Sequence, residues 1–217
     1  RALALGIGGD AGAARLEALV DALVYERVIV PIDVEPDPRV TGVHAGESGH
    51  NPIDFVRAQT PAGEALAIYS SAEVLSAHRP GARPMALDFR TIGLTALVET
   101  GGRVVVNPGT DAVLLPRPAV ASLAQGDAWL PAWRDEDLRD LLLAESSAAC
   151  PAIADLAIVY AGDGLTRVLV SVDRARFAQG EGASSMTAAL SAALNAVGAN
   201  PRLIASADRV EIAPVLR

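Results

Sequence analysis

The chain alternates between short runs of β-branched and aliphatic residues and longer stretches in which apolar residues recur every three or four positions. The short runs predict strands and the longer stretches predict amphipathic helices. The predicted strands span residues 28–34, 65–69, 83–87, 104–106, 112–115, 154–160, 165–172, 202–205 and 209–215. The predicted helices span residues 13–25, 70–78, 92–98, 119–125, 135–147 and 184–197.

This order of elements predicts an α/β (α+β) protein with a mixed sheet and packed helices. We expect two domains, residues 1–126 and 135–217, joined through residues 126–135. Two stretches lack a sustained period: residues 1–12, which predict a poorly anchored start, and residues 35–64, which predict a long loop. Pro31 within the first strand predicts an edge position or a bulge.

The stretch from Arg103 to Gly109 carries the most information, because a run of three valines stops at an Asn-Pro-Gly turn. A structural interpretation is sufficient: Asn107 bonds nearby backbone, Pro108 fixes φ, and Gly109 takes a positive φ. A functional interpretation remains open. The turn follows a buried strand, where α/β folds place ligands, and Thr110 and Asp111 would add polar atoms to a small pocket.

Trp129 and Trp133 stand out because aromatic residues make up only 4% of the chain. Their position between the two predicted domains favours a role in sealing the contact between them. The alternative is an exposed patch that binds a partner, since tryptophan is common among interface anchors.

The composition of the chain excludes several classes of ligand and of catalysis. The net charge is -8, so a surface that follows phosphates is not expected, and scarce aromatics disfavour a base-stacking platform. All 18 basic residues are arginine, which excludes the phosphate-binding lysine of P-loop enzymes, Schiff-base catalysis, and biotinyl or lipoyl attachment. Cys150 is the single cysteine, so no intrachain disulfide can form. No apolar run approaches the roughly 20 residues that span a bilayer.

No other group of residues forms a convincing catalytic, metal or cofactor motif. His44 and His50 are six positions apart in a predicted loop, which exceeds the usual spacing of metal ligands. Cys150 has no histidine nearby in the sequence to act as its base. The three acids at the predicted helix start, residues 135–137, are explained by the helix dipole. These weaker candidates are His44, Glu47, His50, His78, Cys150 and the acids Asp135, Glu136 and Asp137. The glycine-rich stretch at residues 6–9 lacks the spacing of a phosphate loop. We therefore expect no catalytic set, no metal and no cofactor.

Three motifs occur in order: Val28-Ile-Val-Pro31, Ala67-Ile-Tyr-Ser-Ser-Ala-Glu73, and Arg103-Val-Val-Val-Asn-Pro-Gly109. A short strand and the helix at residues 119–123 follow. Residues 14–125 thereby resemble the amino-terminal domain of the SseB family, the "enhanced serine sensitivity" proteins. Residues 135–217 resemble its carboxy-terminal domain in the order of their elements. The resemblance implies a mixed α/β fold and no established enzymatic activity, and residues 35–64 depart from its compact pattern.

Two functional hypotheses follow. The first is an uncharacterised SseB-like cytoplasmic protein, non-catalytic, which acts through protein–protein contacts; its partner is unknown, and a second copy of the chain is one candidate. Neither nucleic acid nor membrane is expected as a partner. The alternative is a small-molecule-binding or enzymatic α/β protein, whose pocket lies near Asn107–Asp111 and uses Asp88 and arginines as polar contacts.

Overall fold

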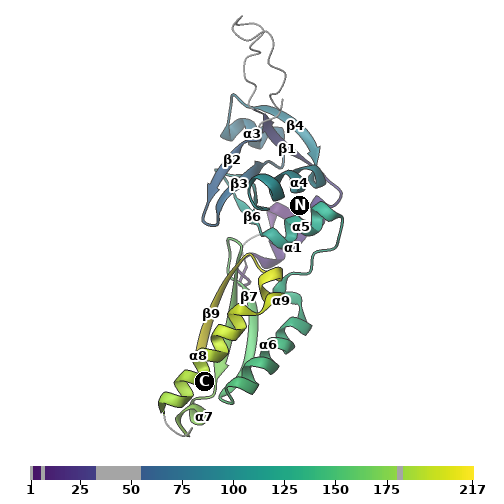
Figure 1. Ribbon diagram of the computed structural model, residues 1–217. Coiled ribbons are helices and arrows are strands. Elements are labelled where there is room, and N and C mark those ends of the chain that lie inside the picture. The colour runs from purple at the N-terminus through teal and green to yellow at the C-terminus, as the bar shows by residue number, and fades with distance from the viewer. Residues whose placement is uncertain (1, 6–7, 33–54, 180–182) are drawn as a thin grey trace, which may run out of the picture.

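The computed structural model of the protein describes residues 2–5, 8–32, 55–179 and 183–217. The molecule is elongated (Figure 1): residues up to 126 form one half, and residues from 132 form the other half. Helices and mixed or antiparallel strands occur in both halves, which confirms the predicted α+β class.

The amino-terminal half contains two sheets. In the larger sheet, β2 (Arg57–Thr60), β3 (Gly63–Ile68), β5 (Val104–Val106) and β6 (Val113–Leu115) lie in that order. Only the central β3–β5 pair is parallel, so both strands end at the same edge of the sheet. All three residues of β5 are buried, because helices and loops cover both faces of this strand.

The smaller sheet pairs β1 (Arg27–Ile32) with β4 (Arg83–Asp88) in antiparallel register. A bridge between Ile29 and Tyr69 joins it to the end of β3, where each backbone N–H donates to the other residue's carbonyl. Since alternate residues of a strand point their backbone groups to the same side, Pro31 has its missing N–H on the side of β1 away from β4. The proline therefore costs no bond of the β1–β4 ladder, and β1 needs no bulge.

Four helices cover these sheets: α1 (Ala13–Leu23), α3 (Ala72–His78), α4 (Phe89–Glu99) and α5 (Arg117–Gln125). The main core cluster joins α1, α4 and α5 to β1, β3, β5 and β6. Helices α4 and α5 approach closely at Gly93, where a Cβ atom would lie 3.0 Å from the Cβ of Ala124. A short 3-10 helix, η1 (Ala2–Ala4), also packs on this core through Ala2 and Leu3.

The carboxy-terminal half is built on one three-stranded sheet. Its strands are β7 (Ile153–Tyr160), β8 (Leu165–Val172) and β9 (Arg209–Leu216). The predicted strands at 154–160 and 165–172 correspond to β7 and β8, which form an antiparallel hairpin, and β9 lies parallel to β8. The remaining elements are η2 (Ala132–Arg134), α6 (Glu136–Ala149), α7 (Arg174–Gln179), α8 (Ala183–Ala199) and α9 (Pro201–Ser206). Helices α6 and α8 pack together against the sheet (Figure 1).

Three expectations were wrong. Residues 57–64 form a hairpin rather than a loop, because Thr60 closes the turn: its Oγ1 accepts from Ala62 N and donates to the Gly63 carbonyl. Residues 202–205 form helix α9, whose cap is Asn200 and whose first position is Pro201. The described start of the chain is also anchored on the core through η1. Residues 33–54, which include the end of the predicted strand at 28–34 and most of the predicted loop, lie outside the described residues.

Candidate functional site

Asn107, which follows β5, connects the ends of the two parallel strands. Its side chain bonds Ser70 twice: Oδ1 accepts from the Ser70 N–H at 2.8 Å, and Nδ2 donates to Ser70 Oγ at 3.0 Å. The Asn107 backbone N–H donates to the Ile68 carbonyl at 2.8 Å. The residue is buried and has a φ of 52°, a left-handed conformation that asparagine tolerates better than most residues.

Gly109 allows the turn to pack against helix α3. Its φ is 86°, as the turn prediction requires, and a Cβ atom there would lie only 2.2 Å from Nε2 of His78. The opposite ring nitrogen, Nδ1 of His78, lies 2.8 Å from the hydroxyl of Tyr69. Burial raises the pKa of the Tyr69 phenol, and the Arg79 cation offsets part of that rise. His78 therefore packs between the turn and the Tyr69 hydroxyl.

The remaining turn residues also have structural partners. The Thr110 N–H and hydroxyl both donate to the Asn107 carbonyl, while Asp111 accepts a two-pronged bond from the guanidinium of Arg15 on α1, at 2.6 and 3.1 Å. Arg15 is buried, whereas the Asp111 side chain is largely exposed. Pro108 is buried. The turn thus braces the end of β5 against the segment after β3 and against two helices.

Ser71 caps α3. Its Oγ accepts from the Val74 N–H at 3.3 Å, and a hydrogen bond with Ser71 lowers the pKa of Glu73. This leaves Ser70 free to face the other way, toward Asn107. The sequence motif therefore contains two serines with separate tasks.

A cavity of about 690 Å³ lies beside these strand ends. Ser70 and Val106 line it together with Val28 of β1 and with Ala18, Leu19 and Ala22 of α1. The Asn107–Asp111 turn does not line it, but Asn107 holds Ser70 in its wall. Asp88 lies away from this cavity in an exposed pair with Arg27, whose Nε is 3.7 Å from Asp88 Oδ1.

Trp129 and Trp133 contact each other edge to face, with ring centroids 5.6 Å apart. Trp133 packs against core residues of both halves and donates from Nε1 to Glu17 of α1; its ring is tilted against that of Tyr160 on β7, with centroids 4.9 Å apart. Trp129 packs only against the amino-terminal core. Both rings are half-buried, so they contribute to the contact between the halves and also reach the surface.

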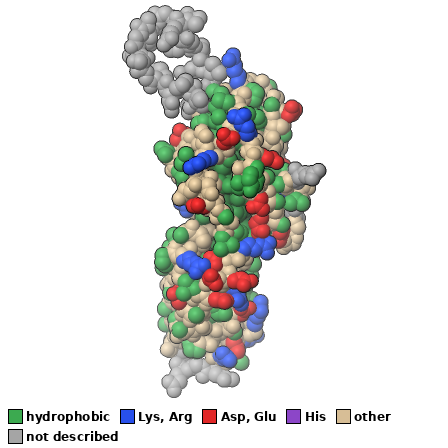
Figure 2. Space-filling model, turned by 90° about the vertical axis from the view of Figure 1, so that its right-hand side faces the viewer, with side chains coloured by type: hydrophobic (Ala, Val, Ile, Leu, Met, Phe, Trp, Pro, Cys, Tyr) green, Lys and Arg blue, Asp and Glu red, His purple; other side chains and the backbone are tan. Residues whose placement is uncertain are grey.

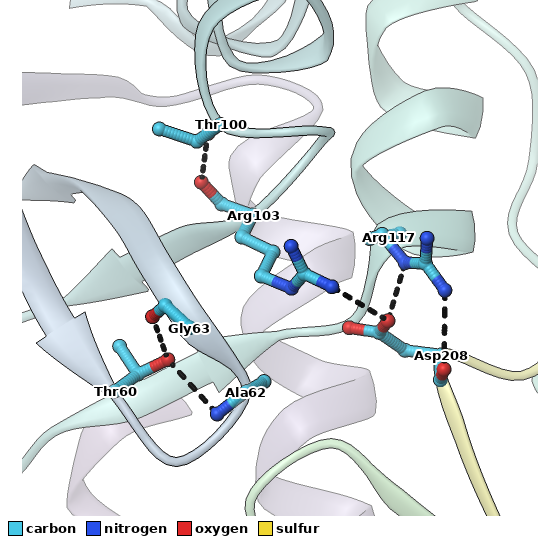
Figure 3. Close-up of polar contacts among 7 residues, drawn as sticks. All are labelled: Thr60, Ala62, Gly63, Thr100, Arg103, Arg117 and Asp208. Carbon is cyan, nitrogen blue, oxygen red and sulfur yellow. Dashed lines mark hydrogen bonds and ion pairs between the residues drawn. The ribbon is translucent and has the colours of Figure 1, made fainter.

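A second link between the halves consists of Arg103, Arg117 and Asp208 (Figure 3). The Asp208 carboxylate, which has no exposed area, accepts from Arg117 Nε and lies 4.0 Å from Nη2 of Arg103. Arg117 Nη2 also donates to the Asp208 carbonyl at 3.2 Å. Sequence reasoning missed this cluster and the Arg15–Asp111 pair, since 91 or more positions separate Asp208 from its partners and nothing local marks them.

The remaining candidates that the structure describes have structural partners. His44, Glu47 and His50 lie outside the described residues. Cys150 is buried with its sulfur 3.8 Å from that of Met186, and Asp135 caps α6 by accepting from the Leu138 N–H. Within the described parts of the chain, no group of three or more potential ligands could hold a metal ion. None of the described helices combines the length and apolar character needed to cross a bilayer.

The family model described as the SseB protein N-terminal domain matches residues 1–122. The chain belongs to the SseB family. The SseB match extends from η1 into α5 and includes the Asn107 turn, the Ser70–Ser71 pair and all the residues that line the cavity. No curated protein and no solved structure matches the chain.

Within this SseB domain, replacing Asn107 separates its hydrogen bonds from its backbone conformation. We expect Asn107→Gly to lose about 1–2 kcal/mol of unfolding free energy, because the Ser70 N–H loses its acceptor. Asn107→Ala should lose about 1 kcal/mol more, because alanine is strained at positive φ whereas glycine is not. Urea unfolding monitored by tryptophan fluorescence would measure both, and equal losses would contradict the strain contribution.

Replacing Asp208 tests the link between the halves. We expect Asp208→Asn to lower the unfolding free energy by about 1–3 kcal/mol, a value between those of exposed and buried pairs, because two arginines lose their counter-charge. Glu211→Gln is the matched control: its pair with Arg167 is similar in type, at 2.9 Å, but half-exposed on the sheet. Chemical denaturation would compare the two, and a loss no larger than that of the control would refute the assignment.

Proposed function

We propose that this SseB-family chain is a cytoplasmic, non-catalytic protein that acts through contacts with another protein. The observation that supports this is an apolar ridge on α4, formed by Leu94, Leu97 and Val98, whose exposed fractions are 51%, 39% and 87%. These positions follow the i, i+3, i+4 spacing that places side chains on one face of a helix. Exposed aliphatic groups in such a row commonly mark an interaction surface.

The ridge is notable because the other side of α4 already contributes to the core. Ile92 and Ala96 are fully buried there, and Gly93 packs against α5. The helix is therefore apolar on both its inner and its outer face, which a surface helix does not require for folding. Between Arg90 and Glu99 it carries no charged residue. A partner with an aliphatic groove or helix face would match this chemistry.

The distribution of charge agrees with a protein partner rather than a nucleic acid. On the face shown in Figure 2, arginines are scattered among acidic side chains and form no continuous basic area. Hydrophobic side chains gather on the part of that face formed by the amino-terminal half. We further propose that residues 1–126 and 135–217 are two domains held together by Trp133 and the Asp208 cluster.

A charged substitution within the ridge tests the proposal. We expect Val98→Asp to remove capture of a specific partner, or self-association, while leaving the melting temperature within a few degrees of the wild type, since the side chain is exposed. The control is Ile204→Asp on α9, which makes the same change at another exposed aliphatic residue. Affinity capture from the native organism and sedimentation velocity would provide the readouts. Equal results for both variants would exclude the ridge as the contact surface.

The alternative function, small-molecule binding near the Asn107–Asp111 turn, is supported by one observation: a cavity opens at the adjacent ends of β3 and β5. Native-state binding raises the melting temperature. A thermal-shift screen of metabolites, serine included, should therefore give hits with the wild type that weaken with Asn107→Ala, because Asn107 positions Ser70 in the cavity wall. A flat response across the screen would favour protein contacts alone.

A further inference from the structure

The cavity beside β3 and β5 has the composition of a binding site for a small apolar molecule. Its volume of about 690 Å³ falls in the range of roughly 300–1,000 Å³ typical of ligand pockets. Aliphatic side chains form most of its wall, and α1 contributes two alanines one turn apart, Ala18 and Ala22, where larger residues would fill the space. The wall therefore favours an aliphatic ligand.

Ser70 supplies a fixed polar group in this apolar wall. Its hydroxyl oxygen accepts from Asn107 Nδ2, and its backbone N–H donates to Asn107 Oδ1, so Asn107 fixes both the side chain and the backbone of Ser70. Among the described residues, none accepts a hydrogen bond from the Ser70 hydroxyl. The antiparallel bridge between Ile29 and Tyr69 also places Ser70 opposite Val28, which is another wall residue. The site thus offers one positioned donor next to aliphatic surface.

Charges near the cavity do not favour an ionic ligand. Glu26 and Arg27 both line it, both are exposed, and their charges are opposite. Arg27 additionally faces Asp88 at 3.7 Å. An anion would therefore meet the Glu26 carboxylate, while a cation would meet the Arg27 guanidinium.

From these observations we propose that the cavity binds an uncharged, mainly aliphatic molecule whose oxygen accepts a hydrogen bond from Ser70. This rests on the small-molecule alternative given above and names its ligand class. The tail lies along α1 between Ala18 and Ala22, and the oxygen lies at the ends of β3 and β5. Asn107 then acts as a positioning residue, because it orients Ser70 without lining the cavity.

Three probes with tails of similar length separate the ligand classes: 2-octanone, octanoate and octylamine. By isothermal titration at pH 7, we expect saturable binding of 2-octanone with a Kd of about 1 mM or tighter. The two ions should bind at least about tenfold more weakly, because neither matches the charges at the opening. Ser70→Ala should weaken ketone binding about fivefold, the effect of one hydrogen bond.

Two leucine substitutions on α1 locate the site. Ala22→Leu should weaken ketone binding at least about tenfold, because the added side chain occupies the cavity. Ala14→Leu is the matched control, since Ala14 is exposed on the same helix and does not line the cavity. Melting temperatures of all variants would verify that they are folded.

Each outcome decides the proposal. Ketone binding that is lost in Ala22→Leu and retained in Ala14→Leu supports it. Absence of ketone binding, equal binding by the two leucine variants, or tighter binding of either ion overturns it. If an ion or a screened metabolite binds and Ala22→Leu removes that binding, the ligand class is wrong but the small-molecule function stands. If nothing in the screen binds either, that function fails as well.

Discussion

The pair of hydrogen bonds between Asn107 and Ser70 is the interaction on which the amino-terminal half depends. Parallel strands β3 and β5 end at the same edge, and both chains must leave the sheet there. Backbone groups at such an edge lose their ladder partners and need substitutes when they are buried. The Asn107 side chain supplies one such partner, because its oxygen accepts from the Ser70 backbone N–H, while its nitrogen donates to the Ser70 hydroxyl. Its left-handed backbone sets the direction in which β5 leaves the sheet.

The turn at Asn107 also brings later residues into contact with two helices. Once the chain has turned at Asn107, Gly109 reaches the ring of His78, and Asp111 reaches Arg15 on α1. Helix α3, the buried hydroxyl of Tyr69 and helix α1 are thereby held relative to the β3–β5 pair. The exposed Asp111 carboxylate is screened by solvent, so its pair with Arg15 serves mainly to give the two terminal nitrogens of a buried guanidinium their acceptors. Steric fit at Gly109 and hydrogen bonding at Asn107 contribute more than this ion pair to holding the helices against the β3–β5 pair.

The elements that sequence reasoning predicted correctly have a strong local signal. The Val104–Val106 strand, the hairpin around residues 161–164 and helix α6 with its acidic first turn all follow from residues that are neighbours in the chain. The errors arose where one local signal has two meanings. Pro61 and Gly63 suggested a loop but form a hairpin turn, and Asn200-Pro201 starts a helix in a stretch that looked extended. Long-range partners such as Arg117 and Asp208 leave no local pattern, so packing alone reveals them.

The difference between local sequence signals and long-range packing also applies to the candidate site. The Asn-Pro-Gly motif is visible in the sequence because a strand must stop there, and its visibility suggested a pocket lined by the turn itself. In the structure the polar atoms of Asn107, Thr110 and Asp111 bond protein groups, which reduces what they can offer a ligand. The neighbouring cavity instead depends on inconspicuous residues: two alanines on α1 and one serine that the motif holds in place. A rigid turn thus positions a binding wall that it does not enter, and this explains how one motif can be structural in its contacts and still matter for function.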